Sequence, residues 1–358
     1  MIKQTGFTLI ELMLSLALGL IITAAAVLLF LASQRSLSMQ QGVSDIQDNA
    51  NFGLNYITRD IRLSNLNNLE SVITDEVAYS GLVLTSSINA KTDNTTTPAT
   101  PLSNLNKTIV GTTANVNLLS RSGEMAAGTA PMWDGISNVQ IGGADIRSDQ
   151  LVIQYLPQYI VDQKGTPANE DDDTLAGGFD CEGNRLEFRV KQNPANLAEP
   201  FGQQMVVQRY FLRLDANAGT NEPNQPLALA CDAGIYPASG SPAEITNYGD
   251  AGEIIMKRVD HFRILLGVQY ANNNRRYVSV NEYMTMAAPH PRIVSVELGA
   301  LTRSSQSVGA DSVIKNDQEF VILDQTVKVK ESGDTAKYVR QVVSQTVALR
   351  NAMGERGV

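Results

Sequence analysis

One long uncharged segment near the start of this 358-residue chain decides where the rest of it can fold. No charged residue occurs from Leu12 to Gln34, and most of these 23 residues are apolar. As an α-helix rising 1.5 Å per residue, the segment spans about 35 Å, which is enough to cross the hydrocarbon core of a bilayer. The next apolar run, Ile264 to Val268, is far too short. The sequence therefore predicts one membrane anchor followed by a large soluble part.

The residues around this segment distinguish it from an ordinary secretory signal. Lys3 is the only charge in the first ten residues, and it predicts a cytoplasmic N-terminus by the positive-inside rule. Glu11 lies inside the apolar block, where a carboxylate costs about 2–3 kcal/mol toward the helix centre. No convincing small-x-small cleavage site follows Leu31. A plain signal anchor with Glu11 near the headgroups is the alternative, but a carboxylate in this position generally has a partner or a function.

The helix is expected to continue beyond the membrane. No proline occurs between Phe7 and Leu63, and Gly42 and Gly53 weaken the helix by only about 1 kcal/mol each, although either could mark a bend. Apolar residues recur at spacings of three and four, which indicates an amphipathic helix with one apolar stripe. These residues are Val43, Ile46, Ala50, Leu54, Ile57 and Ile61.

After Asn65 the pattern changes to short strands separated by polar loops. Two segments alternate with the period of half-buried strands, and five more are rich in β-branched or aromatic residues. In chain order the seven are Asp149–Leu156, Arg185–Lys191, Met205–Leu214, Phe262–Gln269, Arg292–Leu298, Phe320–Val329 and Tyr338–Leu349. The stretches Lys91–Pro101 and Asp215–Pro226 are rich in turn-forming residues. We predict an α+β fold, in which the long N-terminal hydrophobic helix packs on a large, mostly antiparallel β head of one elaborated unit or two subdomains divided near residue 200.

Composition and charge argue against several classes of function. The chain has 28 basic and 37 acidic residues, a net charge of −9 and a single tryptophan, and it lacks a basic stripe. We therefore expect no sequence-specific nucleic-acid binding. Neither GxxxxGK[ST] nor GxGxxG occurs, so no nucleotide cofactor is expected. His261 and His290 lie in no recognisable nucleophile motif, and we expect no catalytic residue and no enzymatic activity.

The cysteines and the acidic residues were also weighed as sites. Cys181, Cys231 and the two histidines are too scattered for a structural zinc site. In an oxidising compartment a Cys181–Cys231 bridge would close a loop of about 50 residues and stabilise the head by about 4 kcal/mol, with two free buried thiols as the alternative. The run Glu170–Asp173 lacks the spacing of a calcium loop, and we interpret it as a solvated loop and predict no metal site. Arg275 and Arg276 are expected at a hairpin tip.

The N-terminal residues Gly6-Phe7-Thr8-Leu9-Ile10-Glu11, with the apolar run behind them, resemble the class III signal of type IV prepilins and pseudopilins. The resemblance implies that prepilin peptidase removes residues 1–6 by cutting after Gly6 and methylates the new N-terminus at Phe7. Residues 7–34 would then form the transmembrane and assembly half of the helix, residues 35–65 its amphipathic half, and residues 66–358 a periplasmic head. It also implies that Glu11 pairs with the N-terminal amine of a neighbouring subunit, which would make its burial tolerable.

Further residues resemble PilW-like minor pilins. They are Phe52–Arg62, Phe179–Gly183, Arg209–Phe211, Leu229–Cys231 and Val347–Asn351. The resemblance implies a low-copy subunit that joins other minor pilins in a tip complex and primes type IV pilus assembly, serving twitching motility, adhesion and DNA uptake. Implied partners are other minor pilins, the major pilin, a PilY-type tip adhesin, prepilin peptidase and the inner-membrane assembly machinery. The implied location is the inner membrane before assembly and the pilus tip after it. A J-like minor pseudopilin of a type II secretion system is the alternative.

Overall fold

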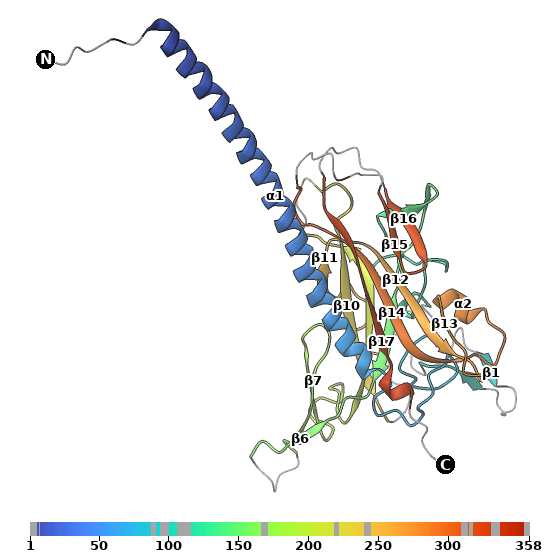
Figure 1. Ribbon diagram of the computed structural model, residues 1–358. Coiled ribbons are helices and arrows are strands. Elements are labelled where there is room, and N and C mark those ends of the chain that lie inside the picture. The colour runs from blue at the N-terminus through green and yellow to red at the C-terminus, as the bar shows by residue number, and fades with distance from the viewer. Residues whose placement is uncertain are drawn as a thin grey trace.

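The computed structural model of the chain is dominated by one helix, α1 (Leu9–Leu63), whose N-terminal half projects away from everything else (Figure 1). The structure describes residues 6, 8–86, 91–93, 100–105, 116–165, 171–217, 222–239, 245–308, 314, 318–330 and 337–353. At 1.5 Å per residue, the 55 residues of α1 span about 82 Å. The predicted helix is confirmed, and it continues unbroken through Gly42 and Gly53.

The two halves of α1 have opposite environments. The large apolar side chains from Leu9 to Leu31 are all exposed, and by length and composition this part of the helix can cross a membrane. In the second half Ile46, Ala50, Leu54, Ile57 and Ile61 are buried, as the apolar stripe predicts, whereas Val43 at the start of the stripe is half-buried. The helix therefore docks on the head with one half only.

Two four-stranded antiparallel sheets form most of the head. The first has the order β11-β10-β9-β5, with β5 at Leu151–Tyr155, β9 at Gln204–Leu214, β10 at Leu227–Pro237 and β11 at Glu253–Lys257. The second has the order β13-β12-β14-β17, with β12 at Val259–Gln269, β13 at Arg275–Val278, β14 at Arg292–Arg303 and β17 at Arg340–Ala348. The chain passes from the first sheet to the second at Arg258, a non-glycine residue with a φ of 56°.

Smaller antiparallel sheets surround these two. One has the order β15-β16-β3-β4 and is built from β3 (Val139–Ile141), β4 (Ala144–Asp145), β15 (Glu319–Ile322) and β16 (Gln325–Val329). Another has the order β6-β7-β8, built from β6 (Ile160–Asp162), β7 (Thr174–Phe179) and β8 (Arg185–Arg189). A strand pair, β1 (Lys91–Asp93) and β2 (Thr100–Leu102), lies near the short helix α2 (Val280–Met284) (Figure 1). Two 3-10 turns, η1 (Val116–Leu118) and η2 (Arg350–Ala352), complete the elements.

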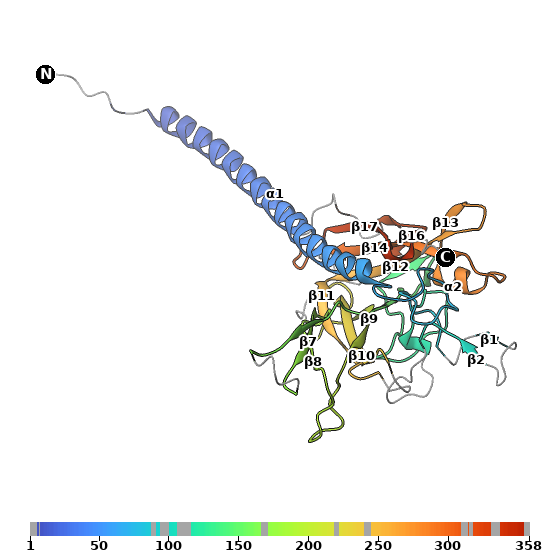
Figure 2. The ribbon, with the colours of Figure 1, turned by 90° about the horizontal axis from the view of Figure 1, so that it is seen from below.

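The C-terminal half of α1 covers the place where the two large sheets meet. It packs on β11 of the first sheet and on β14 and β17 of the second, and both views show it along this seam (Figures 1 and 2). One hydrophobic core joins the helix to both sheets, with Ile57, Leu229 and Leu298 among its members. Gly53 is required at this contact, because a Cβ there would lie 2.6 Å from Cε and 2.9 Å from Cβ of Met256 on β11. The glycine serves close packing rather than a bend.

The predicted α+β class is confirmed, and each of the seven predicted strand segments contains a strand. The segment Phe320–Val329 is two strands, β15 and β16, that form a hairpin with its turn at Leu323, where φ is 55°. The stretch Lys91–Pro101 supplies β1 and the start of β2, although it was expected to be turns. Strands from both sides of residue 200 share the first sheet, because β5 pairs with β9.

Candidate functional site

The N-terminus of α1 is closed by its own side chains. The Thr8 backbone N–H and hydroxyl both donate to Oε2 of Glu11 at 2.9 Å, and the Glu11 N–H donates to the Thr8 hydroxyl at 3.3 Å. This reciprocal pair is a capping box, which satisfies donors that the first turn of a helix leaves open. Gly6 is exposed just before it, and Phe7 lies outside the described residues.

The capping box gives Glu11 hydrogen bonds within its own chain. We predicted Glu11 to need a partner from another subunit, and Thr8 was not identified as a contact. The sequence carried the signal, because Thr8 and Glu11 have the T-x-x-E spacing of a capping box. Among the described residues Glu11 forms no ion pair, and its side chain is hydrogen-bonded to Thr8.

The predicted disulfide lies where α1 meets the head. Cys181 and Cys231 are bonded, with their Cα atoms 6.1 Å apart, so the alternative of two free thiols is excluded. The bridge ties the turn after β7 to the middle of β10, and the Tyr56 hydroxyl on α1 donates to the Cys181 carbonyl at 3.0 Å. Helix, hairpin and central sheet are thereby joined at one place.

A second polar contact joins α1 to the first sheet. Asp60 is almost fully buried, and its Oδ2 accepts a hydrogen bond of 2.8 Å from the hydroxyl of Tyr210 on β9. Burial raises the pKa of Asp60 to about 6, although the Tyr210 hydrogen bond acts in the opposite direction. A carboxyl group with a raised pKa is therefore enclosed in the helix–head interface, a feature that sequence reasoning missed.

Three carboxylates converge beside the disulfide. One oxygen from each of Glu182, Asp232 and Asp250 lies within 4.8 Å of the other two. Burial, followed by the charges of Asp232 and Asp250, raises the pKa of Glu182 to about 8. Asp232 is fully buried and forms an ion pair with Arg209, which is buried as well. A cluster of this kind is unfavourable unless a cation or protons offset its charge.

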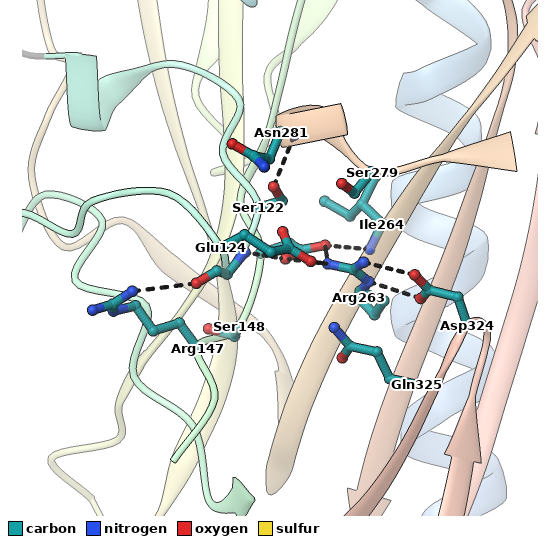
Figure 3. Close-up of polar contacts among 12 residues, drawn as sticks. Ser122, Glu124, Arg147, Ser148, Arg263, Ile264, Ser279, Asn281, Asp324 and Gln325 are labelled. Carbon is teal, nitrogen blue, oxygen red and sulfur yellow. Dashed lines mark hydrogen bonds and ion pairs between the residues drawn. The ribbon is translucent and has the colours of Figure 1, made fainter. Parts of the chain in front are cut away.

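An ion network centred on β12 joins several elements of the head. Figure 3 shows Arg263 of β12 at its centre, with bonds of 2.9 and 2.7 Å to both carboxylate oxygens of Asp324 and an ion pair of 2.9 Å with Glu124. The buried Asp149 lies 3.4 Å from Arg263 and accepts backbone N–H bonds from Gly123 and Ile264 at 2.8 and 2.7 Å. The network links the β15–β16 turn, β12 and the loop before β5, which is a structural role.

Both histidines have structural partners. His261 is fully buried on β12 with Nε2 3.1 Å from Oε1 of Gln325, and burial lowers its pKa to about 4. His290 lies with Nδ1 2.7 Å from Oδ1 of Asp75 and Nε2 2.9 Å from the Met286 carbonyl. The contacts of both rings are thus to groups that hold the fold together.

The acidic run predicted to be a solvated loop is exposed at Asp171 but half-buried at Asp172 and buried at Asp173, so the prediction is wrong for the end of the run. Glu170 lies outside the described residues, Asp171 is exposed with an ion pair to Lys191, and Asp173 is buried, so these side chains diverge. Arg275 and Arg276 open β13 directly after the β12–β13 turn, which confirms the hairpin. Arg276 forms an ion pair with Glu282 of α2.

Comparisons with known proteins agree with these features. The prokaryotic N-terminal methylation motif matches residues 1–27, and the family described as type IV pilus-assembly protein W matches residues 224–351, from the loop before β10 to η2. A type IV-like pilin from Thermus thermophilus is a similar solved structure, with 13% identity, a TM-score of 0.24 and coverage of 57% of this chain and 78% of that chain. No curated protein matches the sequence.

The long half-exposed helix, the capped N-terminus and the methylation motif define a type IV pilin-like protein with a membrane-anchoring helix. The family match over the second half of the head points to the PilW-like minor pilins among such proteins, and it agrees with the resemblance to PilW-like minor pilins seen in the sequence. Residues 224–351 are similar to the type IV pilus-assembly protein W family, and residues 1–27 carry the N-terminal methylation motif, so the chain resembles a PilW-like minor pilin.

Proposed function

We propose that this chain is a low-copy minor pilin that joins other minor pilins in a tip complex and primes assembly of the type IV pilus. The observation that carries the proposal is the contrast between the two halves of α1. The side chains of the first half are exposed, whereas the second half packs against the head. Bare apolar helices of this length can leave lipid only by packing against similar helices. A head of this size suits the end of a fibre, where no subunit must fit above it.

The N-terminus supports processing before assembly. We infer that prepilin peptidase cuts after Gly6 and that the new N-terminus, Phe7, is methylated, which leaves residues 7–34 in the inner membrane and the head in the periplasm. The disulfide supports an oxidising compartment for the head, because such bonds persist there and are rare in the cytosol.

Glu11 is proposed to act in two stages. In the membrane the capping box supplies the carboxylate with two hydrogen bonds from Thr8, which lowers the cost of holding it in lipid. During assembly the amine of a neighbouring subunit supplies the missing positive charge, so that the pair is favoured over the isolated carboxylate. The capping box fixes the Glu11 side chain, and the pairing of its charge with the amine favours the assembled helix bundle.

Substitutions can separate these two contributions. Gln at this position preserves the capping box but removes the charge, whereas Glu11→Ala removes both. We expect both variants to be cleaved normally and to be depleted from sheared fibres, while Thr8→Ala, which loses a cap of about 1 kcal/mol, is incorporated nearly as well as the wild type. Quantitative immunoblots of fibres and membranes measure this, and mass spectrometry identifies an N-methylated Phe7 peptide. Normal incorporation of Glu11→Gln would show that capping, and not charge pairing, is what assembly needs.

The priming role has its own test. Deleting the protein should reduce the number of surface pili, and supplying it in trans should restore them. Normal pilus numbers in the deletion strain would contradict priming. Loss of exoprotein secretion with intact pili would instead support a type II secretion pseudopilin. The proposed partners are other minor pilins, the major pilin, a PilY-type tip adhesin and the inner-membrane assembly machinery, and cross-linking from the head identifies which of them lie beside it.

A further inference from the structure

A carboxylate follows each cysteine of the disulfide, and a third comes from a nearby turn. Glu182 follows Cys181, Asp232 follows Cys231, and Asp250 lies in the turn before β11. We propose that these three residues bind one divalent cation of the calcium class. The site is distinct from the run Glu170–Asp173 that the sequence brought to attention, and it does not depend on the pilus role proposed above.

The spacing of the oxygens suits such an ion. One oxygen of each carboxylate lies within 4.8 Å of the other two. Calcium binds oxygens at about 2.3–2.6 Å, so two ligands on opposite sides of the ion are about 4.6–5.2 Å apart. One ion can therefore contact all three residues with little movement of the backbone.

The strongest sign of a missing ligand is the side chain of Asp232. It is fully buried, and its Oδ2 accepts hydrogen bonds from Gly249 N–H at 2.9 Å and from Arg209 Nε. Among the described residues its Oδ1, also buried, has no hydrogen-bond partner. Buried polar atoms almost always have one, and a bound cation would supply it here.

Charge balance points the same way. Three carboxylates against the single guanidinium of Arg209 leave a charge of −2, which one divalent ion neutralises. Arg209 cannot fill the site itself, because its Nη2 donates to the backbone carbonyls of Pro131 and Asp250. Arg209 thus contacts both Asp232 and the backbone of the Asp250 turn, and the proposed ion would bind the remaining carboxylate oxygens.

The backbone holds the third ligand in place. Gly252, with a φ of 57°, lies so close to β10 that a Cβ would be 2.1 Å from the Cys231 carbonyl oxygen. The Asp250 turn therefore rests directly on the strand that carries Asp232. On the other side of the bridge, Asp180 accepts the backbone N–H groups of Glu182 and Asn184 at 3.0 and 2.8 Å, which fixes the turn that carries Glu182.

The donor set favours calcium over other metals. Both sulfurs are consumed by the disulfide and the cluster contains no histidine, which disfavours zinc and copper. Glu182 and Asp250 line a hollow at the surface together with Asn184 and Glu253, so water or Glu253 can complete a large, irregular shell. Calcium accepts such a shell, whereas magnesium requires a near-ideal octahedron.

The test is isothermal titration calorimetry of CaCl2 into the full chain in detergent, after EGTA has been added and removed. We expect one ion per chain, weaker binding of MgCl2, and at least a tenfold loss of calcium affinity in both Glu182→Gln and Asp250→Asn. Asp171→Asn, an exposed carboxylate outside the cluster, is the matched control and should bind as the wild type does. Asp232→Asn is avoided because it strips a buried arginine of its partner and threatens folding.

A second measurement separates binding from damage to the fold. Calcium should raise the unfolding temperature of the wild type and of Asp171→Asn, because a ligand that binds only the folded state stabilises it. The increase should be lost in Glu182→Gln and Asp250→Asn, whose unfolding temperatures in EGTA should equal or exceed that of the wild type, because each substitution removes one of three mutually repelling carboxylates. Absence of heat and of thermal stabilisation at millimolar CaCl2, or unchanged affinity in both variants, would overturn the proposal.

Discussion

Replacing Asp60 with asparagine is expected to stabilise the head at neutral pH. Asp60 lies in the interface between α1 and β9, where it accepts a hydrogen bond of 2.8 Å from the Tyr210 hydroxyl and forms no ion pair with the described residues. An ionised carboxylate there has lost most of its hydration, and the charge of Arg59 offsets only part of that loss. An asparagine side chain has nearly the same shape, and its carbonyl can still accept the Tyr210 hydrogen bond.

The size and direction of the effect follow from the pKa of Asp60. It is 3.8 in the reference state and about 6 in the folded protein. A difference of one pKa unit corresponds to about 1.4 kcal/mol. The free energy of unfolding therefore falls by about 3 kcal/mol as the pH rises from about 4 to about 6. Below this window the carboxyl group is protonated in both states and the loss is absent. Asp60→Asn should therefore match the wild type at pH 4 and exceed it by up to about 3 kcal/mol at pH 8.

Chemical denaturation of the full chain in detergent measures this difference. The single tryptophan, Trp133, is buried in the head with its indole N–H donating to the Ser148 carbonyl at 3.0 Å, so its fluorescence reports unfolding of the head. Subtracting the free energy of unfolding of the variant from that of the wild type at each pH cancels the contributions of the other titrating groups. Asp48→Asn, an exposed carboxylate on the same helix, is the control. A flat difference between pH 4 and pH 8 for Asp60→Asn would refute the reasoning.

Two further predictions concern how the head is held together. Replacing both cysteines with serine should lower the free energy of unfolding by about 4 kcal/mol, since the bridge closes a loop with a sequence separation of 50; Trp133 fluorescence against denaturant checks this, and an unchanged midpoint would contradict it. Gly53→Ala should destabilise the head by about 1–3 kcal/mol through its clash with Met256, outweighing a helix gain of about 1 kcal/mol. Gly19→Ala, which meets open space, should cost nothing in the same assay.

The parts of the fold that were predictable are those with a regular period. The stripe from Ile46 to Ile61 and the absence of proline fixed the helix and the face that docks on the head. Strand β10 was missed because its sequence, LALACDAGIYP, is buried along most of its length and rich in small residues, so it lacks alternation. The β15–β16 hairpin was read as one segment because its turn uses Leu323, which is not a typical turn residue.

The candidate sites also differ in how far the sequence predicted them. The N-terminal signal was found because a few neighbouring residues specify it, and the disulfide was predicted because the chain has only two cysteines. Asp60 was not identified, because it lies beside the apolar stripe and its partner Tyr210 is 150 residues away. The carboxylate cluster had a partial signal, an acidic residue after each cysteine, but the place of Asp250 depends on how its turn packs against β10.

The unbroken course of α1 also sets the direction in which the head faces. Each residue of an α-helix turns by about 100° and rises 1.5 Å. With no hinge between the exposed half and the docked half, the rotation of the stem among its neighbours dictates which side of the head points outward. One residue added or removed between Gln34 and Arg35 would rotate the head by more than a quarter of a circle about the helix axis, while barely changing its position along that axis. The number of residues in the helix therefore sets the direction in which the head faces.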